Sequence, residues 1–205
     1  MDTERALRRL ASNITDTIRA QPDVLHGRTV DVPSLNGARF DPAGLEGPEL
    51  PLPARRHIDG IEVSSFSSSA SEVIRGLRQL ESSLIWGHAP GYTEANVGRE
   101  FLDNYCHALV SGPDGPLRCR SPLGAFVLFG PNTLYREHSH SPNEVYLTLT
   151  GGGQWRVGDY DWLTLQPGET IFIPSNTVHA IRAGDEPLLT FSFWLEEGSM
   201  DAIAI

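Results

Sequence analysis

The spacing of apolar residues divides the chain into a helical part and a strand-rich part. In the first part, apolar positions recur every three or four residues from Leu7 to Ile18, which predicts an amphipathic helix over residues 3–20. Similar stripes predict two further helices, over residues 69–85 and 94–110. Tyr105 and His107 fall in the third of these helices, so we expect them to pack it against its neighbours rather than to serve a site.

Between the first two predicted helices, residues 27–60 are rich in proline and glycine. This composition predicts an extended segment, either a surface loop or an arm that crosses onto a partner subunit of a homodimer.

From Leu117 onward the apolar runs become short, and turn sequences such as Gly151 to Gly153 separate them. The runs cover residues 125–129, 145–149, 154–157, 162–165, 170–173, 180–182 and 188–195. In the last run, apolar residues alternate with Thr190, Ser192 and Trp194, so one face is expected to pack and the other to line a small-molecule pocket. Several strands at this spacing predict a sandwich or barrel. We therefore expect a helical region with an extended arm over residues 1–115 and a β-barrel over residues 116–205.

Composition and charge exclude several classes of protein. The net charge is −10, which argues against nucleic acid as a partner, because proteins that bind phosphate backbones carry basic patches. No run of 18 apolar residues predicts a membrane span, and the first residues lack the apolar core of a secretory signal. Cys106 and Cys119 have no metal-binding or redox spacing, so a cytoplasmic, reducing location is the default expectation.

The candidate metal-binding and catalytic residues lie mainly between residues 130 and 180. His138, His140, Glu144 and Tyr146 occupy even positions, so they are expected to project from one face of a strand or strand pair. Two imidazoles and a carboxylate at this spacing suit one divalent transition metal ion, such as Zn, Fe(II) or Mn. His179, which follows a short apolar strand and a proline turn, is the expected fourth ligand.

Together these residues resemble the two motifs of the cupin superfamily, over Gly130–Gly151 and Gly168–Ala183. The second stretch has Asn176 where glycine is usual, a replacement that the left-handed backbone region tolerates. The resemblance implies a mainly-β fold: a cupin antiparallel β-barrel, or double-stranded β-helix, with the ion inside and a helical region before it.

Tyr146 narrows the expected chemistry. It lies two residues after Glu144, about 7 Å along the strand. A phenol beside a divalent cation has its anionic form favoured, so Tyr146 is a candidate general base or extra metal ligand; the alternative is an ordinary strand aromatic. Tyr135 and Trp194 add aromatic surface that could face a ligand, although packing is the commoner use of a single tryptophan.

The order of these site residues is similar to that of the cupin-type dimethylsulfoniopropionate lyases and lyase-like proteins. The resemblance implies that His138, His140, Glu144 and His179 bind the metal, that Tyr146 is the base, and that Tyr135 and Trp194 contact substrate, with Tyr135 also a candidate catalytic residue. It implies β-elimination on a small zwitterionic carboxylate, giving dimethyl sulfide and acrylate. An Fe-dependent dioxygenase, an isomerase acting on another small carboxylate, and a non-enzymatic ligand-binding cupin stay open as alternatives.

Overall fold

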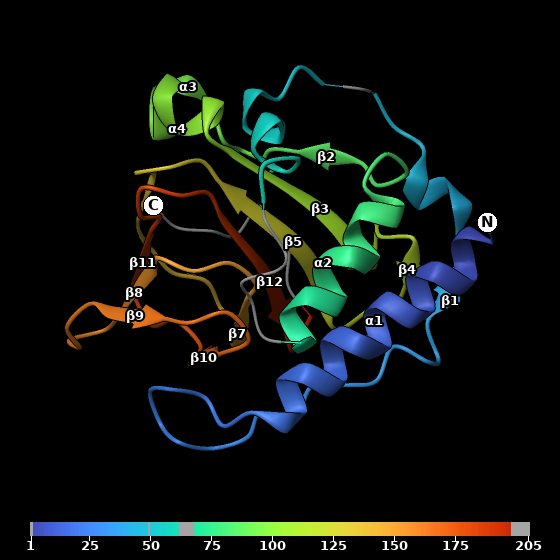
Figure 1. The fold of residues 1–205 in the computed structure, drawn as a ribbon, viewed down its shortest axis with the longest axis horizontal. Coiled ribbons are helices and arrows are strands. Elements are labelled where there is room, and N and C mark those ends of the chain that lie inside the picture. The colour runs from blue at the N-terminus through green and yellow to red at the C-terminus, as the bar shows by residue number, and fades with distance from the viewer. Residues whose placement is uncertain (1, 49, 62–67, 198–205) are drawn as a thin grey trace.

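The computed structural model describes residues 2–48, 50–61 and 68–197. Two sheets, antiparallel except for one short parallel pair in the larger one, face each other and form a barrel, and two helices cover the outside of the larger sheet (Figure 1). This arrangement confirms the predicted fold class, a mainly-β cupin barrel with a helical N-terminal region.

The two long helices are amphipathic and pack against each other. Helix α1 spans Thr3–Ala20 and is capped by Asp2, whose carboxylate accepts a hydrogen bond from the backbone N–H of Arg5. Helix α2 spans Ser68–Leu80, so it ends earlier than the apolar stripe to residue 85 predicted. Each large aliphatic side chain that these helices bury contributes about 1.5–3 kcal/mol relative to exposure.

The larger sheet provides the wall between the helices and the barrel interior. Its path is β1-β4-β3-β5-β12-β7-β10, and β2 pairs with β3 outside this path. The strands are β1 Arg39–Phe40, β2 Trp86–Gly87, β3 Tyr105–Gly112, β4 Leu117–Arg118, β5 Leu123–Phe129, β7 Glu144–Thr148, β10 Thr170–Ile173 and β12 Leu188–Trp194.

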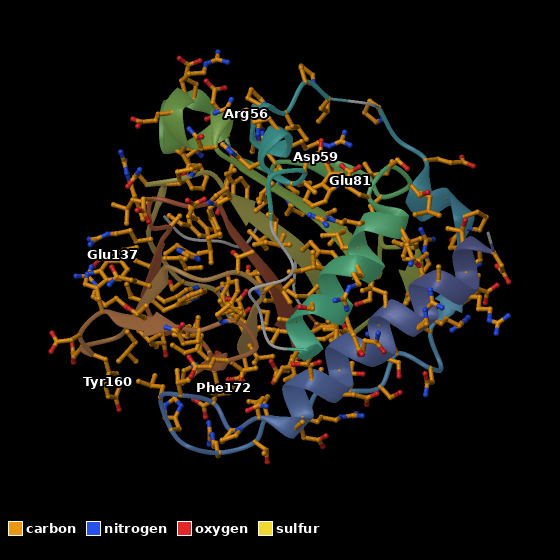
Figure 2. All side chains as sticks on the ribbon, viewed as in Figure 1. Arg56, Asp59, Glu81, Glu137, Tyr160 and Phe172 are labelled. Carbon is orange, nitrogen blue, oxygen red and sulfur yellow. The ribbon has the colours of Figure 1, made fainter. Side chains whose placement is uncertain are left out.

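The smaller sheet closes the barrel on the side away from the helices, in the order β6-β11-β8-β9. Its strands are β6 Leu134–His138, β8 Gly153–Val157, β9 Leu163–Leu165 and β11 His179–Arg182. Figure 2 shows Glu137 and Tyr160 on this outer side, and Tyr160 is exposed. Short helical turns complete the fold: η1 Pro42–Leu45, η2 Pro53–His57, α3 Glu94–Val97 and α4 Arg99–Asp103.

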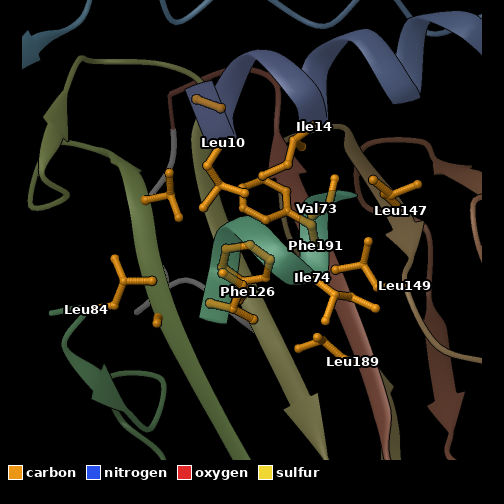
Figure 3. Close-up of a cluster of buried hydrophobic side chains, with 14 of the residues drawn as sticks. Leu10, Ile14, Val73, Ile74, Leu84, Phe126, Leu147, Leu149, Leu189 and Phe191 are labelled. Atoms are coloured by element: carbon orange, nitrogen blue, oxygen red, sulfur yellow. The ribbon is translucent and has the colours of Figure 1, made fainter. Parts of the chain in front are cut away.

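Alternation along the strands produces two separate apolar clusters. On the outer face of the larger sheet, Phe126 and Phe191 meet Leu10, Ile14 and Ile74 from the two helices (Figure 3). The inner face, together with the smaller sheet, encloses the second cluster, which includes Phe129, Tyr146, Trp155, Ile171 and Ile181. Because the larger sheet is buried on both faces, its strands read as apolar runs with weak alternation.

The predicted helix over residues 94–110 is wrong in its second half. Two short helices, α3 and α4, meet at Gly98, whose φ of 84° interrupts the helix, and β3 begins at Tyr105. Tyr105 points into the barrel, whereas Cys106 and Ala108 pack on the helix side. A strand buried on both faces lacks clean period-two alternation, and this explains the wrong assignment.

The segment over residues 27–60 is largely irregular, as predicted, and it packs on its own chain: Val30, Val32 and Leu35 belong to the helix-side cluster. The boundary between residues 115 and 116 stays a prediction. Strand β3 lies before that boundary and pairs with β5 beyond it.

Candidate metal and substrate site

The site lies between the two sheets, where β6 and β11 of the smaller sheet face β7 and β12 of the larger one. His138 ends β6 and pairs in register with His179 at the start of β11. Glu144 begins β7 and pairs with Trp194 at the end of β12. The even-numbered residues were expected on one strand or strand pair; instead, β6 and β7 belong to opposite sheets, and their side chains meet across the interior.

Three histidines form a buried cluster at this point. One ring nitrogen from each of His138, His140 and His179 lies within 4.8 Å of the others. Each imidazole contacts a backbone carbonyl through Nδ1: His138 with Arg136 O at 2.8 Å, His140 with Pro142 O at 3.0 Å and His179 with Thr177 O at 2.9 Å. A carbonyl can only accept, so Nδ1 must donate and a neutral ring then carries its lone pair on Nε2.

Glu144 is 2% exposed. One of its carboxylate oxygens faces the histidines, and the other faces β12. Oε2 lies 3.0 Å from Nε2 of His140 and 3.4 Å from Nε2 of His179. Oε1 accepts hydrogen bonds from the Ser192 hydroxyl and, at 3.0 Å, from the indole N–H of Trp194. A carboxylate this deeply buried is stable because it is paired and hydrogen-bonded.

The donor set fits a divalent cation. Nε2 of His179 is buried without a hydrogen-bond partner, because its 3.4 Å contact with Glu144 lacks hydrogen-bond geometry. In the neutral rings, imidazole lone pairs and a carboxylate oxygen face one another, and this arrangement is repulsive unless a positive charge lies between them. Three imidazoles with a carboxylate suit Zn, Fe(II) or Mn, and they do not select among them.

In the protein without an ion, a proton partly takes the place of this charge. Burial disfavours the charged form of His140, but the Glu144 carboxylate outweighs it and raises the pKa of His140. Burial likewise opposes ionisation of Glu144, yet His140 holds the pKa of that carboxyl well below its ordinary value. His138 stays neutral, because burial and the neighbouring His179 keep its pKa well below the usual range.

Tyr146 lies two residues along β7 from Glu144 and lines the same pocket. It is 3% exposed. Burial, followed by the charge of Glu144, raises its pKa well above that of a free phenol, so without a nearby cation it is a neutral hydrogen-bond donor. Its assignment as base stays a prediction.

Tyr135 stacks on the ring of His138, with ring centroids 3.8 Å apart. Its hydroxyl forms a hydrogen bond with that of Tyr92, a half-buried residue in the turn before α3. Sequence reasoning missed Tyr92, and it placed Tyr105 in a helix, whereas Tyr105 lines the pocket from β3. Recognising residues 105–112 as a strand would have brought Tyr105 into the candidate set.

Trp194 lines the pocket, and its contact with a substrate stays a prediction. Its indole N–H donates to Glu144, and its ring centroid lies 4.5 Å from that of His140. Ser192, also in the lining, was expected on the pocket-facing side of its strand, but its hydrogen bond to Glu144 was not anticipated. Asn176 has φ 57°, in agreement with its predicted left-handed conformation.

The sequence matches known proteins over most of its length. The family model of dimethylsulfoniopropionate lyase matches residues 30–190. The chain is 32% identical to dimethylsulfoniopropionate lyase DddQ of Ruegeria pomeroyi over 105 residues, which are 50% of this chain and 51% of DddQ. It is 27% identical to putative dimethylsulfoniopropionate lyase DddL of Cereibacter sphaeroides over 156 residues, which are 75% of this chain and 64% of DddL.

The match therefore spans about half to two thirds of the length of these curated relatives. One of the crystal structures of the DMSP lyases RdDddP and RnDddQII superimposes on this chain with a TM-score of 0.78 at 26% sequence identity. The superposition covers 100% of this chain and 99% of that one. No helix in the described ranges has the length and apolar character to cross a membrane.

Proposed function

The chain belongs to the dimethylsulfoniopropionate lyase family, and from this premise we propose that it is a metal-dependent carbon–sulfur lyase. Its substrate would be dimethylsulfoniopropionate (DMSP), and its products dimethyl sulfide and acrylate. The observation that carries the proposal is the meeting of three imidazoles and a buried carboxylate beside a pocket whose walls include Tyr105, Tyr135 and Trp194.

The proposed ligands are His138, His140, Glu144 and His179. When bound, a divalent cation would supply positive charge that holds a substrate carboxylate, stabilises negative charge at the adjacent carbon and favours the ionised form of a nearby phenol. The backbone carbonyls at the three Nδ1 atoms hold the imidazole rings with their Nε2 atoms toward the site.

Tyr146 is the proposed base. Its ionised hydroxyl oxygen takes the proton from the α-carbon of the substrate, and the C–H electron pair forms the double bond to the β-carbon. The β-carbon–sulfur bond breaks, and its electron pair leaves with neutral dimethyl sulfide. The reaction needs no oxidant, since it only redistributes electrons within the substrate.

The aromatic walls account for recognition of the sulfonium end. Rings of Tyr105, Tyr135 and Trp194 line the pocket, and each cation–π contact of this kind contributes on the order of 0.5–2 kcal/mol. Burial raises the pKa values of Tyr105 and Tyr135 well above their ordinary value, so both stay neutral beside a cationic substrate.

The test uses the purified full chain, stripped of metal and reloaded separately with Zn, Fe(II) or Mn. We expect dimethyl sulfide in the headspace and an equal amount of acrylate in solution after addition of DMSP. An anaerobic Zn-loaded sample separates this reaction from a dioxygenase, which needs O2 and iron. Failure to release dimethyl sulfide with every ion would contradict the proposal.

A further inference from the structure

The orientation of Glu144 is fixed by side-chain hydrogen bonds, whereas backbone carbonyls hold the three imidazole rings. The carboxylate can rotate about its terminal torsion, which has a broad, two-fold profile. In the structure only Oε2 faces His140 and His179, whereas Oε1 is turned toward β12. Hydrogen bonds to Oε1 therefore decide which oxygen, and which lone pairs, the histidine cluster receives.

Both hydrogen bonds to Oε1 come from β12, which pairs directly with β7. The register places Trp194 opposite Glu144 and Ser192 opposite Tyr146. The side chains of Ser192 and Trp194 point to the same face of the strand because they are two residues apart. The Ser192 hydroxyl and the indole N–H of Trp194 then converge on the same carboxylate oxygen.

We propose that Ser192 is a positioning residue that holds Oε1 of Glu144, turns Oε2 toward the imidazoles and thereby sets the metal affinity of the site. This inference depends on the metal site of the proposed function and extends it to a residue outside the ligand set. Hydrogen-bonded partners of metal-binding side chains commonly determine affinity in this way.

Other buried hydroxyls of the larger sheet show that this contact is particular to Ser192. Thr190, two residues earlier in β12, directs its hydroxyl to the backbone carbonyl of Val127 at 3.4 Å. Ser111 in β3 directs its hydroxyl to the carbonyl of Pro122 at 3.0 Å. Both follow the common side chain-to-backbone pattern, whereas Ser192 donates to an ionised side chain.

Trp194 supports the same oxygen but cannot replace the serine. Its ring also lies against His140, with centroids 4.5 Å apart and planes at 35°, so its position is fixed by packing as well as by the hydrogen bond. With the serine hydroxyl removed, Oε1 keeps a single donor, and rotation of the carboxylate meets less resistance.

The experiment compares Ser192→Ala with the matched control Ser111→Ala. Each removes one buried hydroxyl donor from the larger sheet. Zinc affinity is measured by competition with a chromophoric chelator, and thermal unfolding is measured on the metal-free proteins. We expect Ser192→Ala to bind zinc about 10–100-fold more weakly than the wild type, and Ser111→Ala to bind it with wild-type affinity.

A second variant, Trp194→Phe, keeps an aromatic ring and removes the other donor to Oε1, so zinc affinity should fall in this variant as well. It also provides the test if Ser192→Ala does not fold. Unchanged zinc affinity in the folded Ser192→Ala protein, or in Trp194→Phe if only that variant folds, would overturn the inference. Equal losses in Ser192→Ala and Ser111→Ala would overturn it too, because they would indicate a general effect of a lost buried hydroxyl.

Wild-type zinc binding separates this inference from the proposed function. If the wild-type chain binds zinc and Ser192→Ala binds it equally well, the inference on Ser192 is wrong and the metal site stands. If the wild-type chain binds neither zinc nor any other divalent ion tested, the metal site itself is wrong, and the role of Ser192 with it.

Discussion

Replacing Glu144 by glutamine tests whether the buried carboxylate is a metal ligand or a structural partner. Glutamine keeps the shape of the side chain, and its amide oxygen can still accept from Ser192 and Trp194. Its NH2 group then takes the place of Oε2, which lies 3.0 Å from Nε2 of His140, and can donate to that nitrogen. The hydrogen bonds that Glu144 makes to His140, Ser192 and Trp194 can then all be kept while one negative charge is lost.

A structural role and a ligand role of Glu144 predict losses of different size in stability and in metal affinity. In the metal-free protein a charged hydrogen bond, which contributes about 1.5–3 kcal/mol, becomes a neutral one of about 0.5–1.5 kcal/mol. The difference of about 1–2 kcal/mol corresponds to a loss of about 2–8 °C in Tm for a chain of this size. Metal affinity should fall by more than about 100-fold, because the loss of an outer hydrogen-bonded partner alone costs about 10–100-fold.

The assay pairs thermal unfolding of the metal-free protein with zinc affinity from chelator competition. The matched control is Glu137→Gln, which removes an exposed carboxylate paired with Arg156 on the outside of the smaller sheet. We expect the control to bind zinc as the wild type does. Wild-type zinc affinity in folded Glu144→Gln would refute the assignment of Glu144 as a ligand.

Four further outcomes follow from the site and the cores. Tyr146→Phe should abolish dimethyl sulfide release, as seen in headspace analysis, without lowering metal content, whereas the exposed control Tyr160→Phe should keep both; activity in Tyr146→Phe would remove that residue as the base. Zinc affinity should fall about tenfold per pH unit below the raised pKa of His140, because binding displaces one proton; a flat affinity profile between pH 5 and pH 7, measured by competition as a function of pH, would contradict this. The His140–Glu144 pair should stabilise the metal-free protein most between about pH 4.5 and 6.5, the ordinary pKa values of the two groups. The Tm advantage of the wild type over Glu144→Gln should shrink as pH rises through the raised pKa of His140, and also as pH falls through the lowered pKa of Glu144. A Tm difference that is constant with pH would show that the pair does not form. Leu77→Ala in α2 should cost about 2–5 kcal/mol in urea unfolding and leave zinc affinity unchanged, because the helices lie across the larger sheet from the site; an affinity loss would show that the two are coupled.

The sequence contained enough information to predict the barrel and the group of side chains at its centre. The alternation in β12 correctly separated Ser192 and Trp194, on the pocket side, from Phe191 and Phe193, on the helix side. Alternation of apolar and polar residues predicts which way the side chains of a strand point when one face packs in a core and the other carries polar groups. The residue type at each position then indicates the face on which that residue lies.

Other features depended on tertiary structure that spacing does not encode. Strand β3 is buried on both faces, so its apolar run could be read as a helix, and Tyr105 was assigned to packing as a result. The separation of His138 and Glu144 into opposite sheets depends on the path of the chain between β6 and β7. The contact between Ser192 and Glu144 depends on the register of β12 against β7, which sequence separation does not fix.

The central claim is that one divalent cation binds where the three imidazoles and Glu144 meet. The most direct measurement is elemental analysis of the full chain after loading with Zn, Fe(II) or Mn and exhaustive desalting, carried out in parallel on a variant with His138, His140 and His179 all replaced by alanine. We predict about one tightly held ion per wild-type chain for at least one metal and almost none for the folded variant. Absence of bound metal from the wild type under every loading condition, or equal metal in the triple variant, would contradict the account.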